Sequence, residues 1–144
     1  MNLNNNNINN DLVNTTPPDI NKLIIATHNV HSLTKPPKQH SLLHYMELSN
    51  FDIFGVSETS LTFKEAKYFS LHNEPLFNGS FKYFFHSDKQ RHLGSGVGLI
   101  FKSNIAKHIF NHEGYFGRIL CIDLHNKEKQ ILRIIQIYLY ADDI

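Results

Sequence analysis

Cysteine and tryptophan are nearly missing from this chain of 144 residues, which has a single cysteine and no tryptophan. The lone Cys121 cannot form a disulfide within the chain, and this fits a reducing compartment. Neither sign of charge is in excess, because 14 Lys and Arg residues oppose 13 Asp and Glu residues and leave a formal net charge of +1. The chain therefore lacks the strong overall field that attracts nucleic acids or anionic membranes.

Long apolar runs are also missing. No stretch approaches the roughly 18 apolar residues that span a membrane, and the first residues lack the basic and then apolar pattern of a signal peptide. We therefore expect an intracellular protein with no membrane partner. What the chain has in quantity is aromatic and imidazole side chains, with 11 Phe, 6 Tyr and 10 His. Its length suits one domain with a moderate core.

The first 21 residues have low complexity. Asparagine dominates as far as Asn14, and a Thr-Thr-Pro-Pro segment follows. Such a polar tract buries too little apolar surface to offset its conformational entropy. We predict a disordered tail over residues 1–21 and one domain over residues 22–144.

The stretch that organises the chain reads as strand, turn, helix and strand. Residues 22–27 and 51–57 are apolar without alternation, as in strands that are buried on both faces. Residues 39–48 between them carry their apolar side chains on one side, as in a short amphipathic helix. This order predicts a βαβ unit, with parallel strands and a right-handed crossover.

The remainder predicts mainly antiparallel strands. Thr62 and Glu65 fit a capping box at the start of a helix that extends to about Leu71. Two hairpin patterns follow, over residues 81–86 with 97–101 and over residues 118–124 with 131–139. The predicted fold class is therefore mixed α/β.

Polar side chains end both strands of the predicted βαβ unit. Asn29 follows the first strand and Glu58 follows the second. Because ligands gather where the carboxyl ends of neighbouring parallel strands meet, we expect the two side chains to converge. A carboxylate and an amide oxygen suit Mg²⁺, which usually keeps several waters as well. The residues thus predict a magnesium site at Asn29 and Glu58.

Two short motifs invite other functions. The Gly-rich segment 94–98 needs a following helix to act as a phosphate loop, but apolar residues continue it as a strand. We interpret its glycines as a hairpin corner with close backbone packing. Residues 140–143, Tyr-Ala-Asp-Asp, match the metal-binding YxDD turn of reverse transcriptases. The rest of a polymerase palm has no counterpart, so we interpret them as a polar turn.

Histidines stand at helical spacing in two pairs, His40 with His44 and His108 with His112, the latter near another possible helix. This spacing can hold zinc, but no HExxH pattern or cysteine cluster accompanies either pair. In a chain with 10 histidines such pairs arise by chance, and we interpret them as surface residues. Cys121 lies within an apolar strand pattern and is interpreted as a small core residue.

Four segments, in order, resemble the endonuclease/exonuclease/phosphatase superfamily, whose fold is DNase I-like. THNVHSL at 27–33 resembles its WNV-x-G/S-L segment, and DIFGVSETSL at 52–61 resembles its DI-x-x-L-x-E-T-x-L segment. GSGVGLIFK at 94–102 resembles its Gly-rich GGVALLV strand, and IIQIYLYADD at 134–143 resembles VVNVYAPND. The order and spacing agree over residues 22–144.

The resemblance implies a four-layer α/β sandwich of the DNase I-like type, in which two mixed sheets pack face to face with helices outside. It also implies Mg²⁺- or Mn²⁺-dependent hydrolysis of phosphate esters. Asn29 and Glu58 would then be metal ligands, and Tyr138 would be the catalytic tyrosine that contacts the scissile phosphate. The four segments are most similar in sequence to those of the endonuclease domains of non-LTR retrotransposons, which nick DNA. DNA or another phosphate ester is therefore the expected partner.

The sequence departs from the family pattern at several places. His28 stands where the family has Trp, and Tyr140 stands where it has Pro. The later GD-x-N and SDH motifs, which hold the attacking water and supply a histidine for hydrolysis, are not found. A complete domain of this kind needs about 200–250 residues. We therefore expect the N-terminal part of the fold, C-terminally truncated and catalytically incomplete, as a retroelement remnant or a partial gene model.

Two alternatives stay open. One is a non-catalytic interaction module that keeps half of the fold, and the other is an active phosphodiesterase that takes its missing half from another chain. A truncated sandwich supplies few strands for its second sheet, and an uncovered sheet forgoes about 25 cal/mol per Å² of apolar surface. We therefore expect self-association through the uncovered sheet.

Overall fold

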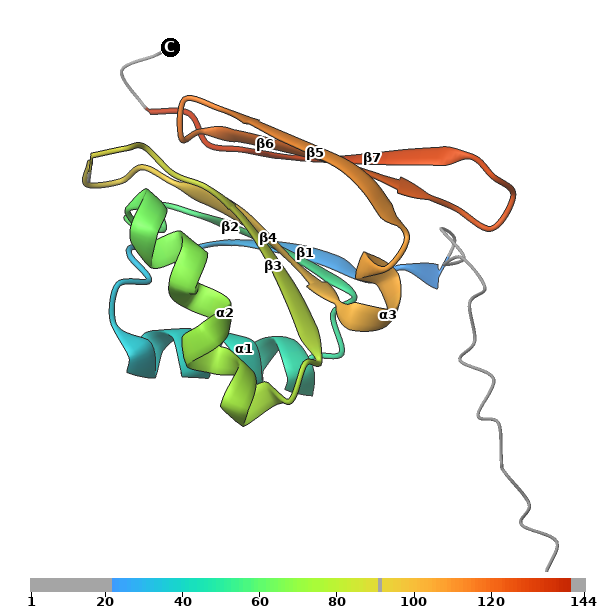
Figure 1. Ribbon diagram of the computed structural model, residues 1–144, viewed down its shortest axis with the longest axis horizontal. Helices are drawn as coiled ribbons and strands as arrows, with labels where there is room; N and C mark the ends of the chain where they lie inside the picture. Colours follow the sequence, from blue (N-terminus) through green and yellow to red (C-terminus); the bar gives the residue numbers. More distant parts are fainter. Residues whose placement is uncertain (1–21, 91, 141–144) are drawn as a thin grey trace, which may run out of the picture.

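The computed structural model describes residues 22–90 and 92–140, which form two β-sheets and three helices (Figure 1). The predicted tail, residues 1–21, lies outside the described residues, and so do Asp142 and Asp143 of the YxDD match. Within the described part of the chain, no helix is long and apolar enough to cross a membrane.

The first sheet contains the predicted βαβ unit. Strand β1 (Ile25–Asn29) pairs in parallel with β2 (Ile53–Ser57), and helix α1 (Pro36–Leu48) connects them. Strand β4 (Val97–Lys102) is antiparallel to β2, and β3 (Phe81–His86) is antiparallel to β4. The order across the sheet is β1-β2-β4-β3. The parallel pair explains why the carboxyl ends of β1 and β2 meet at one edge.

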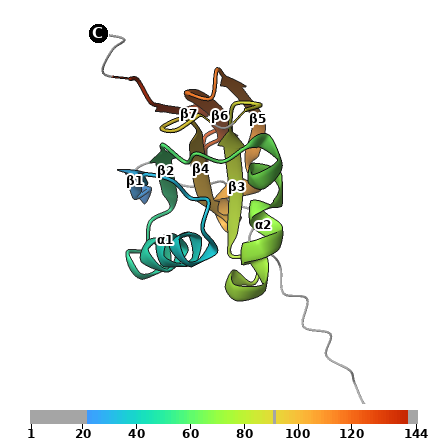
Figure 2. The same cartoon turned by 90° about the vertical axis from the view of Figure 1, so that its left-hand side faces the viewer.

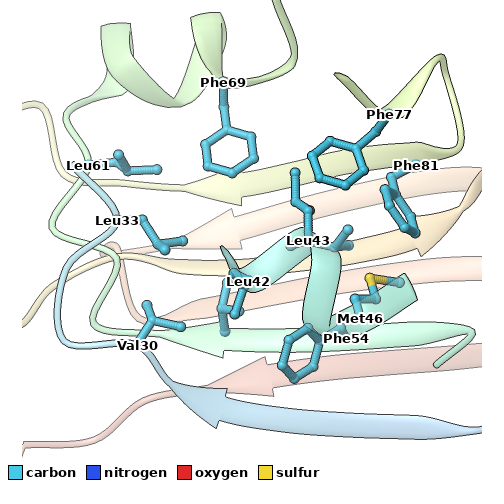
Figure 3. Packing of buried hydrophobic residues seen from close by; sticks show 12 residues of the cluster. Val30, Leu33, Leu42, Leu43, Met46, Phe54, Leu61, Phe69, Phe77 and Phe81 are labelled. Atoms are coloured by element: carbon cyan, nitrogen blue, oxygen red, sulfur yellow. The ribbon is translucent and has the colours of Figure 1, made fainter. Parts of the chain in front are cut away.

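Two helices cover one face of this sheet (Figures 1 and 2). Helix α2 (Phe63–Phe77) lies beside α1 and packs against β3. Leu43 and Met46 of α1 and Phe69 of α2 are buried against Phe54 of β2 and its neighbours (Figure 3). This cluster fixes the helices on the sheet and holds the loops that follow β1 and β2 through Val30, Leu33 and Leu61.

The second sheet covers the other face of the first. After the short helix α3 (Ser103–Ala106), the strands β5 (Ile109–Tyr115), β6 (Ile119–His125) and β7 (Ile131–Ile137) form an antiparallel sheet in the order β5-β6-β7. A second apolar cluster joins the two sheets and includes Ile53, Leu99, Phe101, Leu120, Ile122 and Leu124. The described residues thus form three of the four expected layers, helices, sheet and sheet (Figure 1). The mixed α/β class is as expected.

The strand β1 differs from its prediction as a strand buried on both faces. It is an edge strand among the described residues, and the side chain of Ile25 is half exposed. Its position at the edge leaves one side without a neighbouring strand, so an apolar sequence does not ensure burial. The strand also includes Asn29 as its last residue, where the prediction placed Asn29 after the strand.

The helix boundaries also differ from their predictions. Helix α1 begins at Pro36 and not at Gln39, because the proline pair occupies the first turn, where a missing N–H is tolerated. Helix α2 begins at the predicted capping box but extends to Phe77, beyond Leu71. Its last turn includes Pro75, and Asn78 ends the helix in the left-handed conformation.

Two features of the second sheet differ from the sequence interpretation. The possible helix near His108 is the short helix α3, and residues 109–115 form strand β5, because backbone pairing with β6 compensates for a polar sequence. The pair His108 and His112 is therefore not on a helix. Cys121 is only partly buried. Since side chains alternate along a strand, the burial of Leu120 and Ile122 between the sheets turns Cys121 to the outer face.

Candidate functional site

The carboxyl ends of β1 and β2 bring Asn29 and Glu58 together. Asn29 is paired in register with Ser57, the residue before Glu58. The Asn29 Nδ2 atom donates a hydrogen bond of 2.8 Å to Glu58 Oε1. The convergence expected from the βαβ unit is therefore present in the structure, while the role of these residues as metal ligands stays a prediction.

Tyr138 reaches the same carboxylate from the second sheet. It directly follows β7, and its hydroxyl donates a hydrogen bond of 2.6 Å to Glu58 Oε1. Its backbone N–H donates to the carbonyl of Arg118 at 2.9 Å, which fixes the chain after β7. Asn29 and Tyr138 therefore both donate to the same oxygen of Glu58, and the three residues singled out from the sequence lie together.

The two sheets are joined close to this point. Thr27 Oγ1 of β1 donates to Gln136 Oε1 of β7 at 3.2 Å. Gly55 of β2 lies under the Gln136 amide, where any Cβ would clash with it. A glycine at this position lets β7 approach β2 closely, and this approach places Tyr138 beside Glu58.

His31 completes the cluster and was missed from the sequence. Its Nδ1 atom lies 2.9 Å from Glu58 Oε2, the oxygen opposite the one that Asn29 and Tyr138 contact. The His31 backbone N–H donates to Asn29 Oδ1 at 3.1 Å, and Lys38 Nζ donates to the His31 carbonyl at 2.9 Å. The only available signal was a histidine two positions after Asn29, in the loop that follows β1.

The loops that carry these side chains have an unusual backbone. His31, Ser32, Glu58 and Ser60 have φ values of 44°, 83°, 55° and 52°, in the left-handed region that is rare for residues other than glycine. The loops are tied to each other because Ser32 N donates to the Glu58 carbonyl at 2.7 Å and Leu33 N donates to the Thr59 carbonyl at 2.7 Å. Such conformations persist only where the surroundings impose them, and they cluster at functional sites.

The hydrogen bonds set the charge state of the site. The bond from Tyr138, followed by that from Asn29, lowers the pKa of Glu58 below its ordinary value, and burial only partly opposes this effect. The same contact raises the pKa of Tyr138 to about 12, because the phenol donates to a carboxylate. At neutral pH the site therefore pairs an ionised Glu58 with a protonated Tyr138.

The donor set fits a divalent cation with oxygen preference. Glu58 supplies a carboxylate and Asn29 an amide oxygen. Mg²⁺ typically binds one or two protein groups in this way and keeps several coordinated water molecules. In the structure the Asn29 Nδ2 atom faces Glu58 and donates to it. To hold a cation together with Glu58, the Asn29 amide has to rotate by half a turn, so that its Oδ1 atom faces the carboxylate. Across residues 22–90 and 92–140, no group of three His, Cys, Asp or Glu residues is arranged to hold a metal. The cation would thus depend on water and on a bound phosphate for further ligands.

The Gly-rich segment supports the site without forming a phosphate loop. Gly96 has a φ of +91° and lies against the Thr59 side chain, and Thr59 N donates to the Gly96 carbonyl at 3.1 Å. The residues that follow form β4, and not a helix. The glycines thus allow a hairpin corner to pack on the loop that carries Glu58, as the sequence predicted.

Comparison with solved structures identifies the fold. The chain matches AP endonuclease from Leishmania major with a TM-score of 0.58 and 23% identity, over 79% of this chain and 39% of that chain. It matches D. rerio TDP2, solved in complex with a single-strand DNA product, with a TM-score of 0.51 and 17% identity, over 78% and 44%. It matches the human Nocturnin catalytic domain with a TM-score of 0.50 and 14% identity, over 75% and 46%.

The sequence matches no protein-family model and no curated protein. The chain spans less than half of the length of each of these three structures. All three have the DNase I-like fold of the endonuclease/exonuclease/phosphatase superfamily. The described part of this chain therefore has the DNase I-like fold, as the four sequence segments implied.

Proposed function

We propose that this chain is the metal-binding part of a divalent-metal-dependent phosphodiesterase of the endonuclease type. The observation that carries this proposal is the convergence of Asn29, Glu58 and Tyr138, from the ends of β1, β2 and β7, on one carboxylate oxygen. Three strand ends from two sheets contribute to this cluster. A purely structural contact at an exposed edge has no need of such an arrangement.

Each residue has a distinct task in the proposed site. Glu58, ionised at neutral pH, and Asn29 would hold Mg²⁺ or Mn²⁺. Such an ion, when bound, polarises a phosphoryl oxygen and stabilises the charge that develops during hydrolysis. Tyr138 is protonated at neutral pH, and its O–H, which donates to Glu58 Oε1 in the structure, can donate to a phosphate oxygen instead once the carboxylate holds the cation. The phenol thus orients the substrate and does not act as a base.

DNA is the substrate that we propose. Two of the similar structures support it by their names, because one is an AP endonuclease and the other holds a single-strand DNA product. The four motifs are most similar to the endonuclease domains of non-LTR retrotransposons, so we also propose a retroelement origin. RNA, phosphoinositides and small phosphate esters remain the competing substrate classes.

Hydrolysis needs further groups. The 144 residues contain no counterpart of the GD-x-N and SDH motifs, which hold the attacking water and supply a histidine for hydrolysis in the family that the chain resembles. We therefore propose that these 144 residues bind the metal but do not catalyse hydrolysis by themselves. An active enzyme would take the missing groups from further residues or from another chain.

Metal binding tests the site directly. We expect Mn²⁺ to bind the purified chain, with the loss of the free-ion signal in electron paramagnetic resonance as the readout. Glu58→Gln should weaken this binding at least about tenfold, because it removes the charged ligand. Glu47→Gln, on the exposed surface of α1, is the matched control and should have no effect. Equal binding by wild type and Glu58→Gln would refute the site.

Plasmid nicking tests catalytic incompleteness. We expect Met1–Ile144 with Mg²⁺ to leave supercoiled plasmid intact, because the groups that position water and accept its proton are missing. Robust nicking that disappears in Glu58→Ala and with a chelator would contradict this expectation. That result would show that this chain, alone or as an oligomer, completes the site.

A further inference from the structure

We propose that His31 is a third metal ligand, and that it makes this site select a cation that accepts imidazole nitrogen, such as Zn²⁺ or Ni²⁺, over Mg²⁺. The inference rests on the proposed function, because it concerns the same cation. It adds a ligand and a metal preference that the DNase I-like fold by itself does not supply.

The position of His31 carries the first part of the argument. Asn29 and Tyr138 both contact Glu58 Oε1, while His31 Nδ1 lies 2.9 Å from Oε2. The two carboxylate oxygens thus have different neighbours, and the imidazole occupies the side of Oε2. The His31 side chain is 76% exposed and that of Glu58 is 17% exposed. A cation can therefore reach the nitrogen and the carboxylate from solvent without opening the core.

The loop that carries His31 is built to hold it there. The His31 backbone N–H donates a hydrogen bond to Asn29 Oδ1, and the His31 carbonyl accepts one from Lys38 Nζ. The residue itself is left-handed, with a φ of 44°. The bond from Lys38 and the left-handed backbone do not depend on the orientation of the Asn29 amide, so they hold the loop also when Asn29 Oδ1 turns toward a cation. A surface ion pair between His31 and Glu58 is the simple alternative, but exposed ion pairs contribute little and do not account for a strained loop.

The chemistry of the donors gives the metal preference. Mg²⁺ demands oxygen ligands and keeps its waters, whereas imidazole suits later divalent metals such as Zn²⁺ and Ni²⁺. A set of one carboxylate, one amide oxygen and one imidazole nitrogen is therefore better matched to Zn²⁺ or Ni²⁺. Removal of the imidazole leaves the oxygen pair, which should bind Mg²⁺ as before.

The test compares two metals in matched variants at one fixed pH. Zn²⁺ and Mg²⁺ are titrated into wild type, His31→Ala, His28→Ala and Glu58→Gln, and affinities are measured by calorimetry. Protein labelled with ¹⁵N at histidine reports by NMR which imidazole nitrogen shifts with Zn²⁺, which separates the site from weak binding by other surface histidines. His28, exposed in the same strand end, is the control. Thermal melts followed by circular dichroism verify that each variant is folded.

We expect His31→Ala to weaken Zn²⁺ binding at least about tenfold and to change Mg²⁺ binding less than about twofold, with His28→Ala like wild type. The Nδ1 resonance of His31 should move with Zn²⁺. Binding of Zn²⁺ that requires Glu58 but is unchanged in His31→Ala would overturn this inference and leave the proposed function intact. Equal loss of both metals in His31→Ala would also overturn it, because that outcome indicates a role in loop structure. Binding that does not require Glu58 would instead refute the proposed function.

Discussion

Glu58 is the residue on which the candidate site depends. One of its oxygens accepts hydrogen bonds from Asn29 and Tyr138, and the other faces His31. These donors favour the charged form, so the pKa of the carboxyl is lowered from its ordinary 4.5. Because the folded chain then binds fewer protons than the unfolded chain near this pH, the contacts stabilise the fold above about pH 4.5 and their contribution is lost as the pH falls through the folded pKa.

Tyr138→Phe should raise the pKa of Glu58, because it removes the hydrogen bond with the largest effect. The titration of the Glu58 carboxyl carbon, followed by ¹³C NMR, measures this shift directly. Unfolding in urea should show Tyr138→Phe to be less stable than wild type at neutral pH, with the difference vanishing in acid. Tyr45→Phe, exposed on α1, should leave the titration unchanged. An unaltered Glu58 titration in Tyr138→Phe would contradict the hydrogen bond.

At the scale of single elements, helix α2 begins with a complete capping box. Thr62 Oγ1 accepts from Glu65 N at 3.2 Å, and Glu65 Oε2 accepts from Thr62 N at 2.8 Å. Two backbone N–H groups that would otherwise lack partners are thus satisfied by side chains from the same turn. The helix in turn buries Phe69 and Phe77 on the first sheet.

Thr62→Ala should lower the free energy of unfolding by about 1 kcal/mol, the usual cost of removing a cap. Urea denaturation followed by circular dichroism measures it. The matched variant Lys64→Ala changes an exposed residue of the same turn and should have a much smaller effect. If the two variants lose equal stability, the cap does not contribute as the geometry indicates.

Elements with local signals were predictable, and elements that depend on distant pairing were not. The apolar segments of β2 and β4 and the cap of α2 follow from neighbouring residues, and these predictions are confirmed. Strand β5 contains Asn111, His112 and Glu113, and only its pairing with β6 makes it a strand. Local sequence does not contain that information.

The same distinction holds for the site. Asn29 and Glu58 could be placed together because parallel neighbouring strands end at one edge. Tyr138 came from the family resemblance alone, since it lies 80 residues from Glu58 in the sequence. The contact between His31 and Glu58 depends on a left-handed backbone at His31. Glycine is the usual sequence signal for that conformation, and the loop contains no glycine.

At the scale of the whole molecule, the two sheets cover each other. The expectation that the chain has few strands for a second sheet was wrong, because β5, β6 and β7 form one and bury Ile122 and Leu124 against the first. The outer face of this second sheet still exposes apolar side chains. On β7, Ile131, Ile135 and Ile137 are 64%, 49% and 50% exposed. In the described residues β7 is also an edge strand.

We still predict self-association, now through this outer face and edge. Sedimentation should show a mass that rises with protein concentration. Ile135→Lys should reduce this association, since a charge on an edge strand opposes pairing, whereas Leu48→Lys, at the exposed end of α1, should not. A compact monomer with a sharp cooperative melt at all concentrations would contradict the prediction. Association that persists in Ile135→Lys would place the interface elsewhere.

Because Tyr138 comes from the second sheet and Asn29 and Glu58 from the first, the contacts of the candidate site can form in a particular order. Asn29 and Glu58 are 29 residues apart in the sequence, whereas Tyr138 and Glu58 are 80 apart. A chain emerging from the ribosome exposes β1, α1 and β2 long before β7. Asn29 and Glu58 can therefore come into contact before Tyr138 has been synthesised. The second sheet has to be synthesised and docked before the phenol arrives. The contact between Asn29 and Glu58 can therefore form earlier in the life of each molecule than the contact with Tyr138.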